Sequence, residues 1–289
     1  MRPTLVVAPG AFVTDAGFWY RPLEKLLEPH GIPVRAVDLP SCGNRGPLGD
    51  LFDDAEKIGE VVDEIKGPVF LAGHSYSGLV ITQASAGRGH KVKHLLYISG
   101  ITGDKSIMES DYVVPGEAPE TDIDIRLYGW RLPIPSMLLQ SAKTGGQGAV
   151  ARSMFKFGRW LVMRRGVEAT LGEGKGGGAF KSNELRRLEE KSMIEEGLKR
   201  VTRQSMASFL QGPTRLGIRE IPSTYFLGLN DGEVPRAQLR NQASRCTNVI
   251  EVPTNHFCHL DRPDLVSTAI VKIADELDVG VRPPSRVLG

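Results

Sequence analysis

A serine flanked by small residues stands between an apolar segment and a segment with helical spacing. Val69–Ala72 leads into the motif G-H-S-Y-S-G at residues 73–78, with Ser75 as its third member. Where a strand turns directly into a helix, a serine at the tip takes a strained backbone conformation that exposes its Oγ, and its near neighbours must be small. The motif supplies two glycines and a serine at those positions. The spacing predicts a nucleophilic Ser75, with an ordinary serine in a surface turn as the alternative.

Two histidines follow the last strand-like segment, Asn248–Val252. His256 comes first, and His259 lies three residues further on, nearer to a final helical pattern. A nucleophilic hydroxyl needs a general base within hydrogen-bonding reach. We assign that role to His256 and expect His259 to lie beside the site or in its pocket.

An acidic residue follows the preceding strand-like segment, Ser223–Leu227. Asp231 stands in the loop after this segment, where it would hold the imidazole tautomer and stabilise the imidazolium. Glu233 and Asp104 are the alternatives. The chain order serine, acid, histidine is the one expected when all three residues lie in loops after strands of one sheet.

The tetrahedral intermediate of acyl transfer requires N–H donors for its oxyanion. The residue after the serine, Tyr76, is expected to supply one backbone N–H. The second donor is expected from the loop after the first strand-like segment, where Pro9-Gly10 precedes Ala11. We assign it to the N–H of Ala11. A plain strand-ending turn is the alternative, since Pro-Gly pairs are common in turns.

The segments that must position these residues alternate in type. Short apolar segments predict strands at 4–8, 33–39, 68–72, 92–98, 223–227 and 248–252. Amphipathic segments predict helices at 18–27, 51–65, 235–246 and 263–277, and a further helix beginning near residue 79. Such alternation, with near-continuous apolar strands, predicts an α/β fold whose mostly parallel central sheet has helices on both faces.

Residues 104–213 interrupt the alternation. They contain a Pro-rich stretch at 131–135, a basic stretch with aromatic residues at 152–165, a glycine-rich stretch at 172–178 and a charged segment at 183–209 that predicts a helix. We expect a core of residues 1–103 and 214–289 that carries 104–213 as a helical cap, or lid. The residues expected to line a substrate pocket are Phe12, Trp130, Phe155, Phe157 and Trp160. The basic stretch could alternatively contact a membrane surface or an acidic substrate.

Composition excludes several classes of protein. The chain has 289 residues, a net charge of +2, 40% hydrophobic and 24% charged residues, which is typical of a globular protein without nucleic-acid partners. No apolar run reaches the ~18 residues that span a bilayer, and the N-terminus lacks a signal-peptide pattern. We therefore expect a cytoplasmic protein without a transmembrane segment. The three cysteines, without a CxxC pair, predict free thiols rather than a disulfide framework or a zinc site.

Residues 4–103 and 221–277 resemble the α/β-hydrolase fold, and within it the branch of plant methylesterases and hydroxynitrile lyases. The resemblance rests on P-G-A at 9–11, F-W-Y at 18–20, V-D-L at 37–39, the motif at 73–78, D-G-E-V-P at 231–235 and His256. The branch usually has His-Gly where this chain has Pro9-Gly10, and the resemblance fades inside 104–213. It implies a serine hydrolase that needs no metal or organic cofactor.

The residues and the resemblance together predict cleavage of a carboxylic ester through an acyl-enzyme, with lactones, thioesters and amides as further classes. The expected partner is a small hydrophobic or aromatic ester. A lyase is the second hypothesis, although hydroxynitrile lyases of this branch have a lysine directly after the histidine, where this chain has Phe257. A non-catalytic ligand-binding relative is the third. A serine at position 75 disfavours epoxide hydrolase and dehalogenase chemistry, which use an aspartate there.

Overall fold

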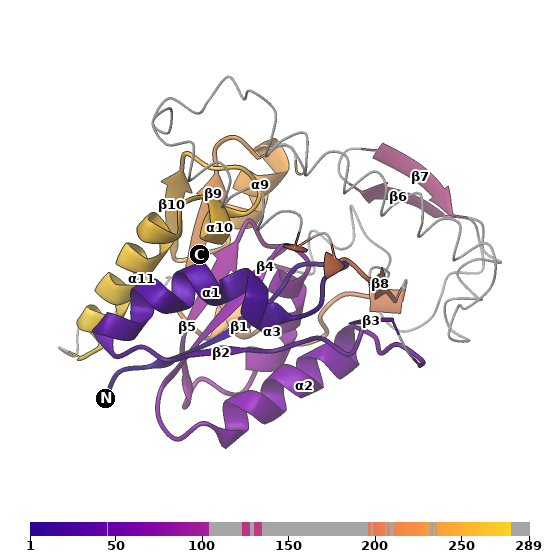
Figure 1. Cartoon of the computed structure of the whole chain (residues 1–289). Coiled ribbons are helices and arrows are strands. Elements are labelled where there is room, and N and C mark those ends of the chain that lie inside the picture. The colour runs from indigo at the N-terminus through magenta and orange to yellow at the C-terminus, as the bar shows by residue number, and fades with distance from the viewer. Residues whose placement is uncertain are drawn as a thin grey trace.

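The structure is a computed structural model, and its central feature is one parallel sheet. It describes residues 1–44, 46–103, 123–127, 130–134, 196–197, 199–205, 207–208, 211–231, 234 and 236–278. Six strands lie in the order β10-β9-β5-β4-β1-β2, and every neighbouring pair is parallel (Figure 1). They are β1 Thr4–Ala8, β2 Val34–Ala36, β4 Val69–His74, β5 Val92–Ile98, β9 Ser223–Gly228 and β10 Asn248–Val252. The predicted fold class is confirmed.

The four central strands are buried on both faces, which explains their continuous apolar sequences. Successive side chains of a strand point to opposite faces. In β1, Val6 packs into one hydrophobic core, whereas Leu5 and Val7 pack into the other. The edge strands β2 and β10 are more exposed. The sheet therefore lies between two separate apolar layers.

Helices cover both faces. One face carries α1 Ala16–Leu27, α10 Cys258–Asp261 and α11 Pro263–Asp278, while the other carries α2 Leu51–Glu64, α3 Ser77–Ser85 and α9 Arg236–Ala243 (Figure 1). Each predicted helix of the core overlaps one of them, and the short α10 was not predicted.

No helix in the described ranges is long and apolar enough to cross a membrane. All three cysteines are free thiols, as predicted.

The start of α2 is determined by its own side chains. Asp50 accepts hydrogen bonds from the backbone N–H groups of Phe52 and Asp53, and the Asp53 side chain accepts one from the Asp50 N–H in return. This reciprocal capping box satisfies N–H groups that have no partner inside the helix. Asp54, in the same turn, is fully buried.

The segment 104–213 is described only in part, so the expected helical cap stays a prediction. Its described residues include a pair of antiparallel strands, β6 Ile123–Leu127 and β7 Trp130–Ile134, which were not predicted. The alternation of apolar and charged residues in 123–127 is the period-two pattern of a strand. Most of the remaining segment lies outside the described residues.

The helix predicted over 183–209 is wrong over 201–205, which are not helical. Arg203–Gln204 forms β8, which pairs antiparallel with β3, Cys42–Gly43. Val201 forms a further antiparallel bridge with Val13, and the Thr202 N–H donates to the Phe12 carbonyl at 2.7 Å. Pairing with segments distant in sequence overrides the local helical propensity here, because propensity is a weak preference that tertiary contacts readily outweigh.

Candidate active site

Ser75 lies in a sharp turn between β4, which ends at His74, and α3, which begins at Ser77. Its φ of 52° falls in the left-handed region, which is strained for a residue with a Cβ. The Ser75 N–H donates to the Ile98 carbonyl at 3.1 Å, and the Ser75 carbonyl accepts the N–H groups of Gly78 and Ile101 at 3.1 and 3.0 Å. These bonds to β5, α3 and the following loop maintain the strained turn.

The small residues of the motif are required by close backbone contacts. A Cβ on Gly73 would lie 2.4 Å from the Ser77 carbonyl oxygen, and a Cβ on Gly78 would lie 2.4 Å from the Ile101 carbonyl oxygen. Ser77, at the position where the strict motif has glycine, is fully buried and its hydroxyl donates to the Pro9 carbonyl. That bond joins the turn to the loop after β1.

His256 and Asp231 form a buried pair at the carboxyl ends of β10 and β9. The His256 Nδ1 donates to the Asp231 Oδ2 at 2.7 Å, and the two side chains are 6% and 1% exposed. The loops are joined by backbone hydrogen bonds from Leu229 to Val252 and from Asn230 to Thr254, at 2.8 and 2.9 Å. Because Nδ1 carries the proton in this contact, the ring's Nε2 remains as its acceptor.

The imidazole of His256 packs against the turn that holds Ser75. Its ring centroid is 4.8 Å from that of His74, the residue before Ser75. Among the described residues, no hydrogen bond joins the Ser75 hydroxyl to His256. In enzymes without a bound ligand this contact is often long and shortens when substrate binds.

His74 has a contact that the sequence analysis did not predict. Its Nε2–H donates to the His256 carbonyl at 3.1 Å. Burial, together with the neighbouring His259 and His256, lowers the pKa of His74 well below its ordinary value, so the ring is neutral. A Cβ on Gly10 would lie 2.7 Å from the His74 Nδ1, so that glycine makes room for the ring. The only signal in the sequence is its place inside the serine motif.

His259 lies beside this arrangement and outside the pair with Asp231, as expected. Its ring stacks on Tyr20 with centroids 4.7 Å apart, and lies 4.8 Å from the ring of His74. Burial and the neighbouring His256 lower the pKa of His259 to about 3. It is therefore a neutral packing residue at neutral pH.

The assigned oxyanion donors belong to adjacent loops. Ala11 follows β1 and Tyr76 follows β4, and these strands are paired up to Ala8 and Gly73. Phe12, next to Ala11, is partly buried, has a φ of 65° and donates its N–H to the Gln204 Oε1 at 2.9 Å.

The remaining predicted residues are not tested by the structure. Trp130 begins β7, of which the backbone is described. The other predicted pocket residues and the alternative acids lie outside the described residues: Phe155, Phe157, Trp160, Asp104 and Glu233. Within the described ranges, no group of three or more His, Cys, Asp or Glu residues is arranged to hold a metal ion.

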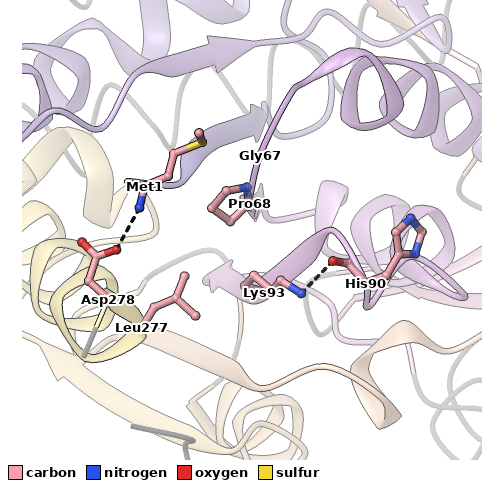
Figure 2. Close-up of a pocket in the computed structure, with 7 residues that line it drawn as sticks. All are labelled: Met1, Gly67, Pro68, His90, Lys93, Leu277 and Asp278. Carbon is pink, nitrogen blue, oxygen red and sulfur yellow. Dashed lines mark hydrogen bonds and ion pairs between the residues drawn. The ribbon is translucent and has the colours of Figure 1, made fainter. Parts of the chain in front are cut away.

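A separate pocket lies at the opposite end of the strands. Figure 2 shows its lining: Met1, Gly67, Pro68, His90, Lys93, Leu277 and Asp278. Pro68 directly precedes β4, whereas Ser75 directly follows it. The N-terminal ammonium pairs with Asp278 there at 3.5 Å. Ligands of open parallel sheets bind at the carboxyl ends of strands, so this pocket is distinct from the candidate active site.

Known proteins are similar to this chain in sequence and fold. A model of the alpha/beta hydrolase family matches residues 5–269. A pyrethroid hydrolase from Sphingobium wenxiniae is 23% identical over 268 residues, which cover 90% of this chain and 84% of that protein. The crystal structure of a pyrethroid hydrolase from Sphingobium faniae has a TM-score of 0.58 at 21% identity, covering 94% of this chain and 97% of the other. A methylesterase from Arabidopsis has a TM-score of 0.57 at 14% identity, covering 94% and 99%.

Proposed function

Because the chain belongs to the alpha/beta hydrolase family, we propose that it is a serine esterase that cleaves carboxylic esters by two-step acyl transfer. The observation that carries the proposal is the buried contact of His256 with Asp231 at 2.7 Å, at the same sheet edge as the strained turn of Ser75. A nucleophile, a base and a residue that orients the base are the parts this chemistry requires.

The proposed reaction assigns the steps to named residues. The Ser75 Oγ attacks the ester carbonyl while the His256 Nε2 takes its proton, and Asp231 stabilises the imidazolium that forms. The backbone N–H groups of Ala11 and Tyr76 donate to the oxyanion. The imidazolium then protonates the departing alkoxide, which leaves an acyl-enzyme. Water, deprotonated by His256, attacks this ester, and collapse of the second intermediate returns the proton to Ser75.

The proposed substrate is a hydrophobic or aromatic ester. The relatives include proteins named pyrethroid hydrolase and methylesterase. The apolar side chains offered by Phe12 and by the aromatic residues of the segment 104–213 support the same class. Lyase chemistry on cyanohydrins fits less well, because the Phe257 ring, 5.6 Å from the His256 ring, occupies the position after the base where a cation would be needed.

A covalent probe tests the proposal. Wild-type protein treated with a fluorophosphonate is expected to gain one adduct on the peptide that contains Ser75. Ser75→Ala should lose the adduct and about 10⁶-fold in kcat for an aryl ester. Ser99→Ala is the matched control, because Ser99 is also buried, follows a strand and has a positive φ of 45°. An adduct on another residue, or a Ser75→Ala activity within tenfold of wild type, would contradict the assignment.

A further inference from the structure

A buried carboxylate lies beneath the candidate site and takes no part in the mechanism above. Asp54, in the first turn of α2, is fully buried. It accepts three hydrogen bonds, from the Ser41 N–H at 2.7 Å, the Ser41 hydroxyl at 2.5 Å and the Tyr76 hydroxyl at 2.7 Å. Within the described ranges no cation pairs with it. Burial raises the pKa of Asp54 to about 6. Burying a carboxylate without a cation lowers the stability of the fold, so we expect Asp54 to have a role that offsets this cost.

One branch of the contacts of Asp54 reaches the serine turn. Tyr76 is 2% exposed, and its hydroxyl donates to the Asp54 Oδ2. Tyr76 is also the residue to which one oxyanion N–H is assigned. The contact with Asp54 therefore anchors the side chain of the very residue whose backbone must point at the reacting oxygen.

The second branch reaches the loop after β1. The Ser41 hydroxyl accepts a hydrogen bond from the Gln204 Nε2 at 2.8 Å, and the Gln204 Oε1 accepts the Phe12 N–H at 2.9 Å. Gln204 belongs to β8, which lies beside β3 near the N-terminal end of α2 (Figure 1). Phe12 directly follows Ala11, the assigned second donor. The donors and acceptors run in a consistent direction, from Phe12 through Gln204 and Ser41 to Asp54.

We propose that Asp54 is a positioning residue that fixes the position of the Ala11 N–H relative to the Tyr76 N–H, the two donors of the oxyanion hole. Asp54 touches no reacting atom, and the inference rests on the proposed function. An oxyanion hole works only when both N–H groups lie about 2.7–3.1 Å from the same oxygen. The two donors here come from different loops. The Asp54 network connects them through buried side chains, and a misplacement of about 1 Å can cost a hundredfold in rate.

Asp54→Asn and Tyr76→Phe perturb the network without changing its volume greatly. An asparagine can still accept the Ser41 N–H, but its NH2 group faces hydroxyls that now donate to the carboxylate. Tyr76→Phe removes only the hydroxyl and keeps the ring. Tyr97→Phe is the matched control, because Tyr97 is fully buried in the same core and its hydroxyl bonds to Thr82 at 2.7 Å, outside the hydrogen bonds of Asp54. Asp53→Asn is the control on α2.

The readouts separate positioning from a general loss of structure. For hydrolysis of an aryl ester, we expect Asp54→Asn and Tyr76→Phe to lower kcat about 10–100-fold with little change in KM. Affinity for a trifluoromethyl ketone, whose adduct with the serine mimics the oxyanion, should fall by a similar factor. Affinity for the product carboxylic acid should change less than threefold. Tyr97→Phe and Asp53→Asn should keep kcat within about threefold. Tm is measured for every variant.

The outcomes distinguish this inference from the proposed function. If the wild type neither hydrolyses esters nor forms the fluorophosphonate adduct, both fail. If the wild type is active but Tyr76→Phe resembles Tyr97→Phe in kcat and in ketone affinity, the positioning role alone is overturned. An equal loss of ketone and carboxylate affinity also overturns it, because that pattern reports general disorder of the site. If Asp54→Asn does not fold, the comparison of Tyr76→Phe with Tyr97→Phe in kcat and ketone affinity tests the positioning role by itself.

Discussion

Replacing Asp231 by asparagine changes one polar atom at a buried contact, and the structure indicates which atom. The Asp231 Oδ1 accepts the Val234 N–H at 2.9 Å, and Oδ2 accepts the His256 Nδ1–H at 2.7 Å. An asparagine retains an acceptor for Val234 by keeping its oxygen at the first position. Its NH2 group then faces Nδ1, which must become an acceptor. The imidazole proton moves to Nε2, the atom that should receive the proton of Ser75.

The expected loss follows from this tautomer change. Removing the orienting acid in this way costs about 10⁴-fold in kcat, which is about 5.4 kcal/mol at about 1.36 kcal/mol per factor of ten. The full loss is expected because the pair is shielded from water, with Asp231 1% and His256 6% exposed in their side chains. Water cannot replace the missing acceptor. The KM for the substrate should change little, since Asp231 does not contact it.

Steady-state hydrolysis of an aryl ester at pH 7–8 measures the effect, with Tm as the check on folding. The matched controls are Asp104→Asn and Glu233→Gln, which change the other acids that the sequence offers for this role. Both should stay within tenfold of wild type. An Asp231→Asn enzyme within tenfold of wild type, or a larger loss at either control, would refute the assignment of the acid.

Two further predictions concern the same edge of the sheet. His256→Ala should lower kcat by about 10⁶-fold, like loss of the nucleophile, whereas His259→Ala should lower Tm but keep kcat within about tenfold, because its neutral ring packs on Tyr20. Equal losses of kcat at a temperature where both variants are folded would contradict this division of roles. Gly78→Ala should lower the free energy of unfolding by at least about 1–3 kcal/mol, the usual cost of overpacking, because the new Cβ would lie 2.4 Å from the Ile101 carbonyl oxygen. Gly89→Ala is the control, because the nearest atom to its Cβ would lie 3.8 Å away. It should change the free energy of unfolding by less than about 1 kcal/mol. Chemical denaturation measures both, and equal stabilities would show that the close contact at Gly78 is not a constraint.

The sheet and the order of the site residues could be predicted because both follow from local patterns. Central parallel strands are apolar throughout, so β4, β5 and β9 are visible in the sequence. Their carboxyl ends must meet at one edge, and this places Asp231 and His256 in neighbouring loops. Their contact at 2.7 Å agrees with that reasoning.

The network around Asp54 could not be predicted, for two physical reasons. An acid in the first turn of a helix is expected to interact with the positive end of the helix dipole, and Asp53 beside it does cap the helix. The inward direction of Asp54 depends on Ser41 and Tyr76, which come from other elements. Gln204 reaches the network only because β8 pairs with β3, and a helical pattern extended over that position.

The chain leaves and re-enters the core at nearly the same place. Gly103 lies against Pro213, so closely that a Cβ on Gly103 would be 2.7 Å from the proline Cγ. The strands on either side of the interruption, β5 and β9, are direct neighbours in the sheet. The entropy of closing a loop grows only with the logarithm of its length, at about 0.6 kcal/mol for each doubling. A change in the length of the chain between these two residues therefore costs little in loop-closure entropy, and the pairing of β5 with β9 does not depend on that length.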